Sequence, residues 1–376
     1  MPQLTDTDHT GQPGHADQAD RPVQADLAGT AGPAAPEERP VAAAGTWMTP
    51  AEYGASRATL WSAACVLITD ADGRVLVQTV DYRPDRLLPG GAVDAGEAPS
   101  AAAAREVYEE LGIRGHYPRG LAVDWIPADA PGYEPEMRFP GEILHVFDGG
   151  TWSGERIAAI RLPGQEITGV QFAEPADLPC LMHPGDARRA LCALRARIDG
   201  GGPALLEDGR PTAPGALDRL GVLRTPRAPQ RGTWHGGPAP ESLPVHDRAA
   251  WLFAPDGRVL VLIARDTGAV RLPEPAPGPL ISESRPLGHL REAEGVRIRS
   301  AARLRALGPA GAAGPGCAEP GYARVLATPE QVRDLSDWGP AAEDQLAAVH
   351  TARARLGLPP APRRPVTELP AEGVTW

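Results

Sequence analysis

The chain has 376 residues, a formal net charge of −11 and a hydrophobic fraction of 42%. This length exceeds what one compact domain usually holds, so we expect two globular units joined by flexible segments. The acidic balance disfavours binding to a nucleic acid polymer or to an anionic membrane surface, because either partner would be repelled. The 43 Pro and 43 Gly predict a protein rich in loops.

The N-terminal segment and the cysteines indicate in which cellular compartment the protein is expected. Residues 1–55 hold scarcely any large apolar side chain, so they are predicted to be disordered. No apolar run reaches the ~20 residues that span a bilayer, and no signal peptide is found. Cys65, Cys180, Cys192 and Cys317 show no paired metal-ligand spacing and are interpreted as reduced thiols. We therefore expect a cytoplasmic protein that does not bind membranes.

Ordered structure is expected to begin near Leu60. Two apolar runs flank the turn at 70–73 and predict a β-hairpin. A helix is predicted over 99–111, because Pro99 suits its first turn and Gly112 suits its C-terminal end. The remaining predicted elements of this unit are strands at 120–126, 143–147 and 170–173 and a helix over 186–197.

The pattern then recurs at an offset of 184 residues. The stretch 72–77 (DGRVLV) returns at 256–261, and Leu88-Pro89 returns as Leu272-Pro273. A helix over 341–356 matches the one that ends the first unit. We interpret this recurrence as a duplicated fold. The expected organisation is a disordered segment at 1–55, a catalytic domain at 56–200, a linker at 201–245, a degenerate second domain at 246–357 and a C-terminal tail at 358–376.

The predicted helix over 99–111 carries an unusual set of charges. Glu106, Glu109 and Glu110 stand at positions i, i+3 and i+4 and therefore share one helix face. Three crowded carboxylates destabilise a bare helix and raise each other's pKa, and a hard divalent cation relieves both effects. The pattern predicts a Mg²⁺ or Mn²⁺ site. Arg105 is placed to pair with Glu97 or Glu109 and to hold the acids in position.

Residues 91–113 as a whole resemble a complete Nudix box, with the spacing G-x5-E-x7-R-E-U-x-E-E-x-G-U. The resemblance to Nudix hydrolases implies an α/β fold, here two α/β/α sandwich domains with mixed sheets, the second degenerate. It also implies attack of a metal-activated water on one phosphorus of a diphosphate. The box positions are Gly91, Glu97, Arg105, Glu106, Glu109, Glu110 and Gly112, with Val107 and Ile113 at the apolar places.

Site roles follow from the same resemblance. Glu106, Glu109, Glu110 and the carbonyl of Gly90 are the implied ligands of Mg²⁺ or Mn²⁺. Glu109, as general base, and Arg105 are the implied catalytic residues. Three further acids outside the box stay open as the base or as an additional ligand: Glu134, Glu136 and Glu142.

The second copy has lost these residues. Aligned without a gap, it retains only Glu294, in place of Glu110, and a shift by one residue brings in Glu292 and Gly295 without rebuilding a three-carboxylate face. We predict a catalytically inactive domain. The other ungapped counterparts of the box are Pro275, Ile281, His289, Leu290 and Ala293.

The expected partner is a small molecule of the nucleoside-diphosphate type, and an oligomer is possible but not indicated. Trp125, Tyr133, Phe139 and Phe147 could stack on a base or belong to the core. A second hypothesis is a catalytically inactive nucleotide-sensing or scaffold protein built on the duplicated fold. A third is an isomerase or biosynthetic enzyme whose product keeps its diphosphate.

Overall fold

The computed structural model describes residues 48–131, 135–164, 166–223, 232–275, 280–309, 321–336 and 338–376. The chain divides into two compact units, Met1–Arg57 and Ala58–Trp376. The described part of the smaller unit holds helix α1 (Pro50–Ala55). Thr49 and Glu52 form a capping box at its start, which explains a helix where disorder was expected. The rest of the segment predicted to be disordered, residues 1–47, lies outside the described residues.

A mixed sheet organises the first half of the larger unit. Its strand order is β6-β2-β1-β5-β4-β7-β8, with β3 also paired to β1, and β1 runs parallel to β5. The predicted hairpin and the predicted strands at 120–126, 143–147 and 170–173 are all present. The strands are β1 (Trp61–Thr69), β2 (Val75–Val80), β3 (Gly90–Ala92), β4 (Gly120–Ile126), β5 (Glu142–Thr151), β6 (Ile167–Ala173), β7 (Ala204–Glu207) and β8 (Arg210–Pro211).

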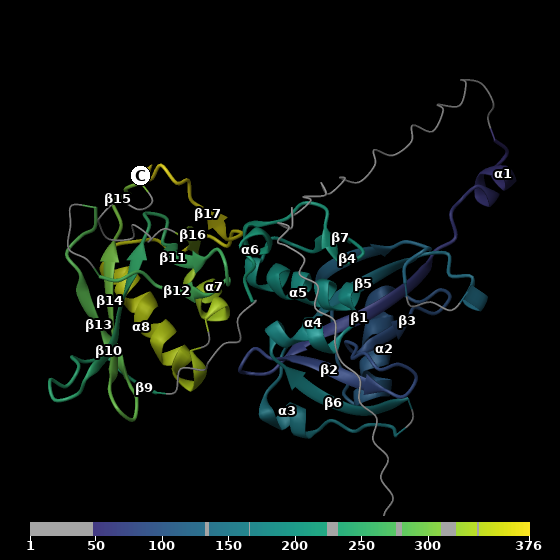
Figure 1. Cartoon of the computed structure of the whole chain (residues 1–376), viewed down its shortest axis with the longest axis horizontal. Coiled ribbons are helices and arrows are strands. Elements are labelled where there is room, and N and C mark those ends of the chain that lie inside the picture. The colour runs from purple at the N-terminus through teal and green to yellow at the C-terminus, as the bar shows by residue number, and fades with distance from the viewer. Residues whose placement is uncertain are drawn as a thin grey trace, which may run out of the picture. The chain divides into compact units, whose positions relative to one another are not determined.

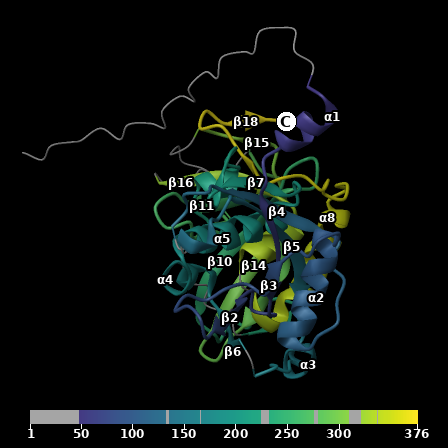
Figure 2. The same cartoon turned by 90° about the vertical axis from the view of Figure 1, so that its right-hand side faces the viewer.

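Helices α2 (Pro99–Leu111) and α5 (Pro184–Asp199) cover opposite faces of this sheet (Figure 1). Alternate side chains of β1 serve the two faces: Val66 and Ile68 pack in the core with α2, and Leu67 packs in the core with α5. Figure 2 shows α2 running lengthwise along the sheet. The expected α/β/α sandwich is confirmed. Shorter helices are η1 (Pro135–Met137), α3 (Gly154–Ala158), η2 (Pro175–Asp177), α4 (Leu178–Leu181) and α6 (Ala216–Arg219).

The second half holds another mixed sheet, of order β17-β16-β11-β10-β14-β13-β9 with β12 paired to β11. Helix α7 packs on β11 and β16, and α8 packs on β13 and β14. The elements are β9 (Thr233–His235), β10 (Val245–Phe253), β11 (Val259–Ala264), β12 (Val270–Arg271), β13 (Arg285–Arg291), β14 (Val296–Arg303), β15 (Ala306–Leu307), β16 (Tyr322–Ala327), α7 (Pro329–Leu335), η3 (Gly339–Ala341), α8 (Ala342–Arg355), β17 (Thr367–Glu368) and β18 (Val374–Thr375).

The two sheets share their pairing pattern. Thr69 pairs with Val75 in the first hairpin, and Phe253 pairs with Val259 in the second, at the sequence offset of 184. The parallel pairing of β1 with β5 is matched by that of β10 with β14. The antiparallel pairing of β2 with β6 is likewise matched by that of β11 with β16. The strand framework supports our interpretation of a duplicated fold.

The described residues of the second half contain no helix equivalent to α2. Between β12 and β13 the described residues, 272–275 and 280–284, contain no helix. The sequence alignment that placed residues 289–294 on a box helix was wrong, because His289 and Leu290 belong to strand β13. Glu292 lies in the connection to β14, where it binds Arg297 and His246. His289 and Leu290 pair with β14 as a strand, although the sequence alignment matches them to the helical part of the box.

The segments predicted to be a linker and a C-terminal tail contribute strands to the sheets. Strands β7 and β8 lie in the expected linker 201–245, and β7 pairs parallel with β4. Strand β17 lies in the expected tail 358–376 and pairs with β16. All three strands are too short to give a periodic signal, and neighbouring Gly and Pro make them resemble loops. The first sheet therefore extends past residue 200.

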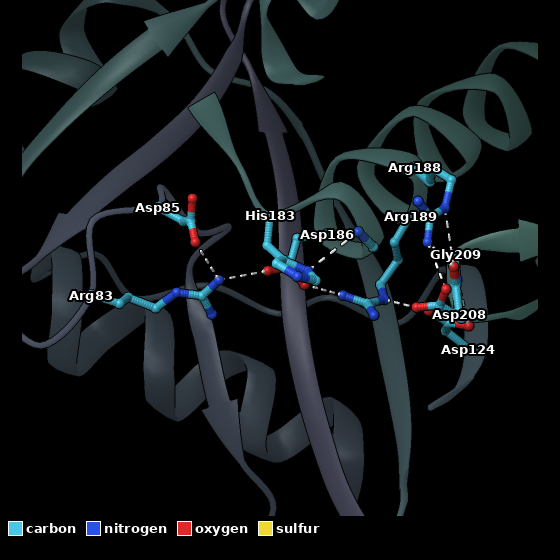
Figure 3. A network of polar contacts seen from close by, with 10 residues as sticks. Arg83, Asp85, Asp124, His183, Asp186, Arg188, Arg189, Asp208 and Gly209 are labelled. Atoms are coloured by element: carbon cyan, nitrogen blue, oxygen red, sulfur yellow. Dashed lines mark hydrogen bonds and ion pairs between the residues drawn. The ribbon is translucent and has the colours of Figure 1, made fainter. Parts of the chain in front are cut away.

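A buried ion pair ties the β7–β8 hairpin to the rest of the first sheet (Figure 3). Asp124 on β4 is fully buried, and Arg189 on α5 donates from Nε to Oδ2 of Asp124 at 2.6 Å. The backbone N–H of Gly209, in the hairpin turn, donates to both oxygens of Asp124 at 3.1 and 3.0 Å. Arg189 also donates to Asp186 at 2.6 Å. These bonds satisfy a carboxylate that has no access to water.

Removal of this carboxylate should destabilise the fold strongly. Asp124→Ala leaves the buried Arg189 with one remaining partner, so we expect a loss of about 3–5 kcal/mol in the free energy of unfolding. Urea denaturation of the whole chain measures it. Glu343→Ala breaks an exposed ion pair with Arg333 and should cost under about 1 kcal/mol. Similar losses in the two variants would contradict a structural role for the buried pair.

None of the described helices is long and apolar enough to cross a bilayer. Cys65, Cys180 and Cys192 are free thiols, as the sequence predicts, and Cys317 lies outside the described residues. The cytoplasmic location stays a prediction.

Candidate active site

Arg105, on α2, is the centre of the charged cluster. Its Nε and Nη2 donate to Glu97 at 3.1 and 2.9 Å, and its Nη1 donates to Glu106 at 2.8 Å and Glu109 at 3.0 Å. Nη2 also donates to the carbonyl of Ala92 at 2.9 Å. All five N–H donors of the guanidinium are thereby used. Arg105 fixes the helix to the loop after β3, and it has no donor left for a substrate.

Glu106 lies against the backbone of Gly91. A Cβ placed on Gly91 would lie 2.7 Å from the Oε1 atom of Glu106, so any larger residue would displace the carboxylate. Burial raises the pKa of Glu106, against the lowering effect of Arg105. The requirement for Gly91 in the sequence pattern is therefore steric.

Glu110 is the most buried of the three acids. It accepts hydrogen bonds from the backbone N–H of Gly90 at 2.8 Å and from Nε2 of Gln78, on β2, at 2.6 Å. Burial nevertheless raises the pKa of Glu110 to about 8. Gly90 has a φ of 146°, and a Cβ there would overlap the carbonyl of Ala64. Only glycine brings this N–H to the carboxylate without strain.

Glu109 differs from its two neighbours in exposure. Its side chain is 55% exposed and is bound through one oxygen, Oε2, to Arg105. The other oxygen has no partner among the described residues. Glu109 therefore presents a free carboxylate oxygen to solvent.

The three acids share a helix face but do not converge on one point. Within the described ranges no group of three or more His, Cys, Asp or Glu side chains is arranged to hold a metal ion. Arg105 draws Glu106 and Glu109 to one side, while Glu110 faces the N–H of Gly90. The roles of Glu106, Glu109, Glu110 and the Gly90 carbonyl as ligands stay predictions.

The chemistry of these residues still fits a divalent cation. Two of the acids are substantially buried with a raised pKa, and each is further raised by the charge of another acid of the cluster. A hard cation would offset that repulsion. Glu106, Glu109 and Glu110 are the residues that would hold it.

Glu166 is a fourth acid of the site that the sequence did not reveal. It precedes β6, and its carbonyl accepts the backbone N–H of Asp81 at 3.1 Å. Its charge raises the pKa of both Glu106 and Glu110. The pairing of β2 with β6 brings it to the site, and that pairing spans nearly ninety residues of sequence.

The acids that the sequence left open are placed differently. Glu136 is exposed in η1, Glu142 is the first residue of β5, and Glu134 lies outside the described residues.

Of the proposed stacking residues, Phe139 and Phe147 are buried, Trp125 on β4 is 45% exposed, and Tyr133 lies outside the described residues.

Comparison with known proteins shows the family to which the chain belongs. A family model described as NUDIX domain matches residues 58–194. A Bacillus subtilis (strain 168) protein named "Putative 8-oxo-dGTP diphosphatase" is 30% identical over 124 residues, which cover 33% of this chain and 72% of that protein. The chain belongs to the Nudix hydrolase family. It is therefore a hydrolase that acts on pyrophosphate bonds, and its Nudix box lies within the matched range.

Other relatives match shorter stretches. Diphosphoinositol polyphosphate phosphohydrolase 2 of Rattus norvegicus is 41% identical over 63 residues, and the match covers 16% of this chain and 35% of the rat protein. The solved MutT NUDIX hydrolase of Burkholderia pseudomallei has 25% identity and a TM-score of 0.29, covering 35% of this chain and 96% of that one. The chain thus spans about a third of the rat protein's length.

Arg105→Lys should impair this Nudix enzyme although it keeps the charge. A lysine has three donors on one atom and cannot bind Glu97, Glu106, Glu109 and the Ala92 carbonyl together. We expect a 10- to 100-fold loss of turnover, as is typical when a residue that orients ligands is replaced. Steady-state kinetics across Mg²⁺ concentrations measures it. Arg114→Lys, at an exposed position after α2, is the control, and equal rates in the two variants would refute the positioning role.

Folding stability should depend on pH through Glu110. Because its pKa is raised from 4.5 to about 8 in the folded chain, the folded state binds the proton more tightly than the unfolded state. Stability should therefore fall as the pH rises between these two values. Thermal unfolding in EDTA at pH 5.5 and 8.5 tests this, and Glu110→Gln should reduce the difference. A wild-type melting temperature that rises over this window, with no change in the variant, would contradict the expectation.

Proposed function

We propose that the protein hydrolyses the diphosphate bond of a nucleoside-diphosphate-linked molecule or a nucleoside triphosphate, with water as the nucleophile. The observation that carries this proposal is the complete Nudix box at residues 91–113, in which Arg105 on α2 holds Glu106 and Glu109. The name of the Bacillus relative, which refers to a nucleoside triphosphate, supports the substrate class. A small-molecule substrate, rather than a nucleic acid polymer, is part of the proposal.

The residues have separate roles. Mg²⁺ or Mn²⁺ held by Glu106, Glu109 and Glu110 would supply positive charge to the phosphoryl oxygens and acidify water. Glu109 accepts the proton of the attacking water through the carboxylate oxygen that Arg105 leaves free. Arg105 orients Glu106 and Glu109 and keeps the helix against the loop. Gly90 and Gly91 allow the backbone to approach the acids.

Replacement of the acids should abolish turnover. We expect Glu109→Gln and Glu110→Gln each to lower kcat by about 10²–10⁴-fold, the usual range for a lost acid–base or charge-stabilising group. Glu155→Gln, at an exposed position on α3, is the matched control. The assay is a panel of nucleotide sugars, dinucleotides, nucleoside triphosphates and ADP-ribose with Mg²⁺ or Mn²⁺, with phosphate release and product masses measured.

Three outcomes would count against the proposal. Unchanged rates in both Gln variants would show that the box acids are not used. Tight nucleotide binding without turnover across the panel would favour the sensing or scaffold hypothesis. A product that retains its diphosphate would favour the isomerase or biosynthetic hypothesis.

A further inference from the structure

The loop between β2 and β3 begins and ends at residues that bind one of the box acids, Glu110. Its base is closed by two backbone hydrogen bonds between Gln78 and Leu87, of 2.8 and 3.1 Å. The side chain of the same Gln78 binds Glu110 at 2.6 Å. The loop's far end leads into Gly90, whose N–H binds Glu110 as well. Residues 79–86 are thus anchored at both ends to the buried acid of the Nudix box.

Tyr82 in this loop is an exposed aromatic residue close to charged groups of the site. At 61% it is the most exposed aromatic side chain in the described part of the chain. Partial burial, together with the charges of Glu166 and Glu110, raises the pKa of its phenol. Its neighbour Asp81 is fixed by the N–H bond to the carbonyl of Glu166. The ring contributes little to the core and remains available to a ligand.

Arg83, the next residue, has most of its donors free. Only Nη2 is engaged, at 3.3 Å from Asp85 and 3.3 Å from Asp186 (Figure 3). The remaining N–H groups have no partner in the described residues. Asp186 is held in turn by Arg189 at 2.6 Å. Arg83 is therefore oriented by a fixed counter-ion while most of its guanidinium can bind an anion.

These contacts indicate a role for Tyr82 and Arg83 in substrate recognition, and this inference rests on the proposed function. We propose that Tyr82 and Arg83 form a rim pair that recognises the nucleotide part of the substrate. The ring of Tyr82 stacks on the nucleobase, and the guanidinium of Arg83 binds a phosphate that does not react. Both residues determine specificity and take no part in the bond cleavage.

The charge of the site favours a nucleotide over a densely phosphorylated ring. Four acids, Glu106, Glu109, Glu110 and Glu166, surround the site, and every donor of Arg105 is already used. An inositol ring with many phosphates would need several basic side chains around it to offset that repulsion. A nucleoside triphosphate carries fewer charges and brings an aromatic base, which suits one free guanidinium and one exposed ring.

The test compares a substrate with a base to one without. For the nucleoside triphosphate that is cleaved fastest in the panel, Tyr82→Ala should raise KM about 10-fold with kcat changed less than about 3-fold, as expected for a lost stacking contact. Tyr82→Phe keeps the ring and should stay near wild type. For inorganic tripolyphosphate, Tyr82→Ala should have no effect. Arg83→Gln should raise KM about 10-fold for both. Tyr53→Ala, at another exposed tyrosine, on α1, is the control.

Different failures point to different errors. Turnover with wild-type KM in both Tyr82→Ala and Arg83→Gln would overturn the rim pair and leave the proposed function intact. An equal rise of KM for the two substrates in Tyr82→Ala would also overturn it, since no base would be recognised. Unchanged rates in both Glu109→Gln and Glu110→Gln would reject the proposed function instead. Calorimetric binding of the same nucleotide to wild type and Tyr82→Ala gives a readout without turnover, and equal affinities there would refute the stacking contact.

Discussion

The site depends on how Arg105 distributes its five hydrogen bonds. Three carboxylates on one helix face repel each other, and the helix stays intact because this guanidinium lies between Glu106 and Glu109 and reaches across to Glu97. The same contacts fasten α2 to the loop after β3, where the Ala92 carbonyl is the last acceptor. One cation therefore sets both the position of the helix and the direction of two of its acids. Arg105 does not bind Glu110, which is the most buried of the three acids and whose carboxylate has no cationic partner among the described residues.

The sequence predicts well those parts of the molecule that depend on local spacing. The bounds of α2 follow from Pro99 and Gly112, and the hairpin follows from its turn residues. It does not predict parts that depend on pairing between distant strands. Glu166 reaches the site only because β6 pairs with β2, and the β7–β8 hairpin is recognised only by its pairing with β4. Hydrophobic periodicity carries no information about either contact.

In the second sheet, no helix of the described residues packs on the face that α2 covers in the first sheet. The order of the central strands is kept, since β16-β11-β10-β14-β13 matches β6-β2-β1-β5-β4, but the face that α2 covers in the first sheet has to be filled by other side chains. Ala250 and Leu260 on that face pack with Leu304 and Leu307, and Leu369 from the C-terminal segment adds to them. Apolar surface left open by a missing helix would be exposed to water. The segment expected to be a tail is therefore part of a core.

The hydrogen bond from Gly209 to Asp124 is donated by a residue beyond the end of the part of the chain that matches the family. The family resemblance ends at residue 194, inside α5. A chain cut at that point would lose the last turn of the helix and the Gly209 N–H, which among the described residues is the backbone donor to the buried Asp124 carboxylate. The buried Asp124 therefore has partners on both sides of residue 194: Arg189 lies before it and Gly209 after it.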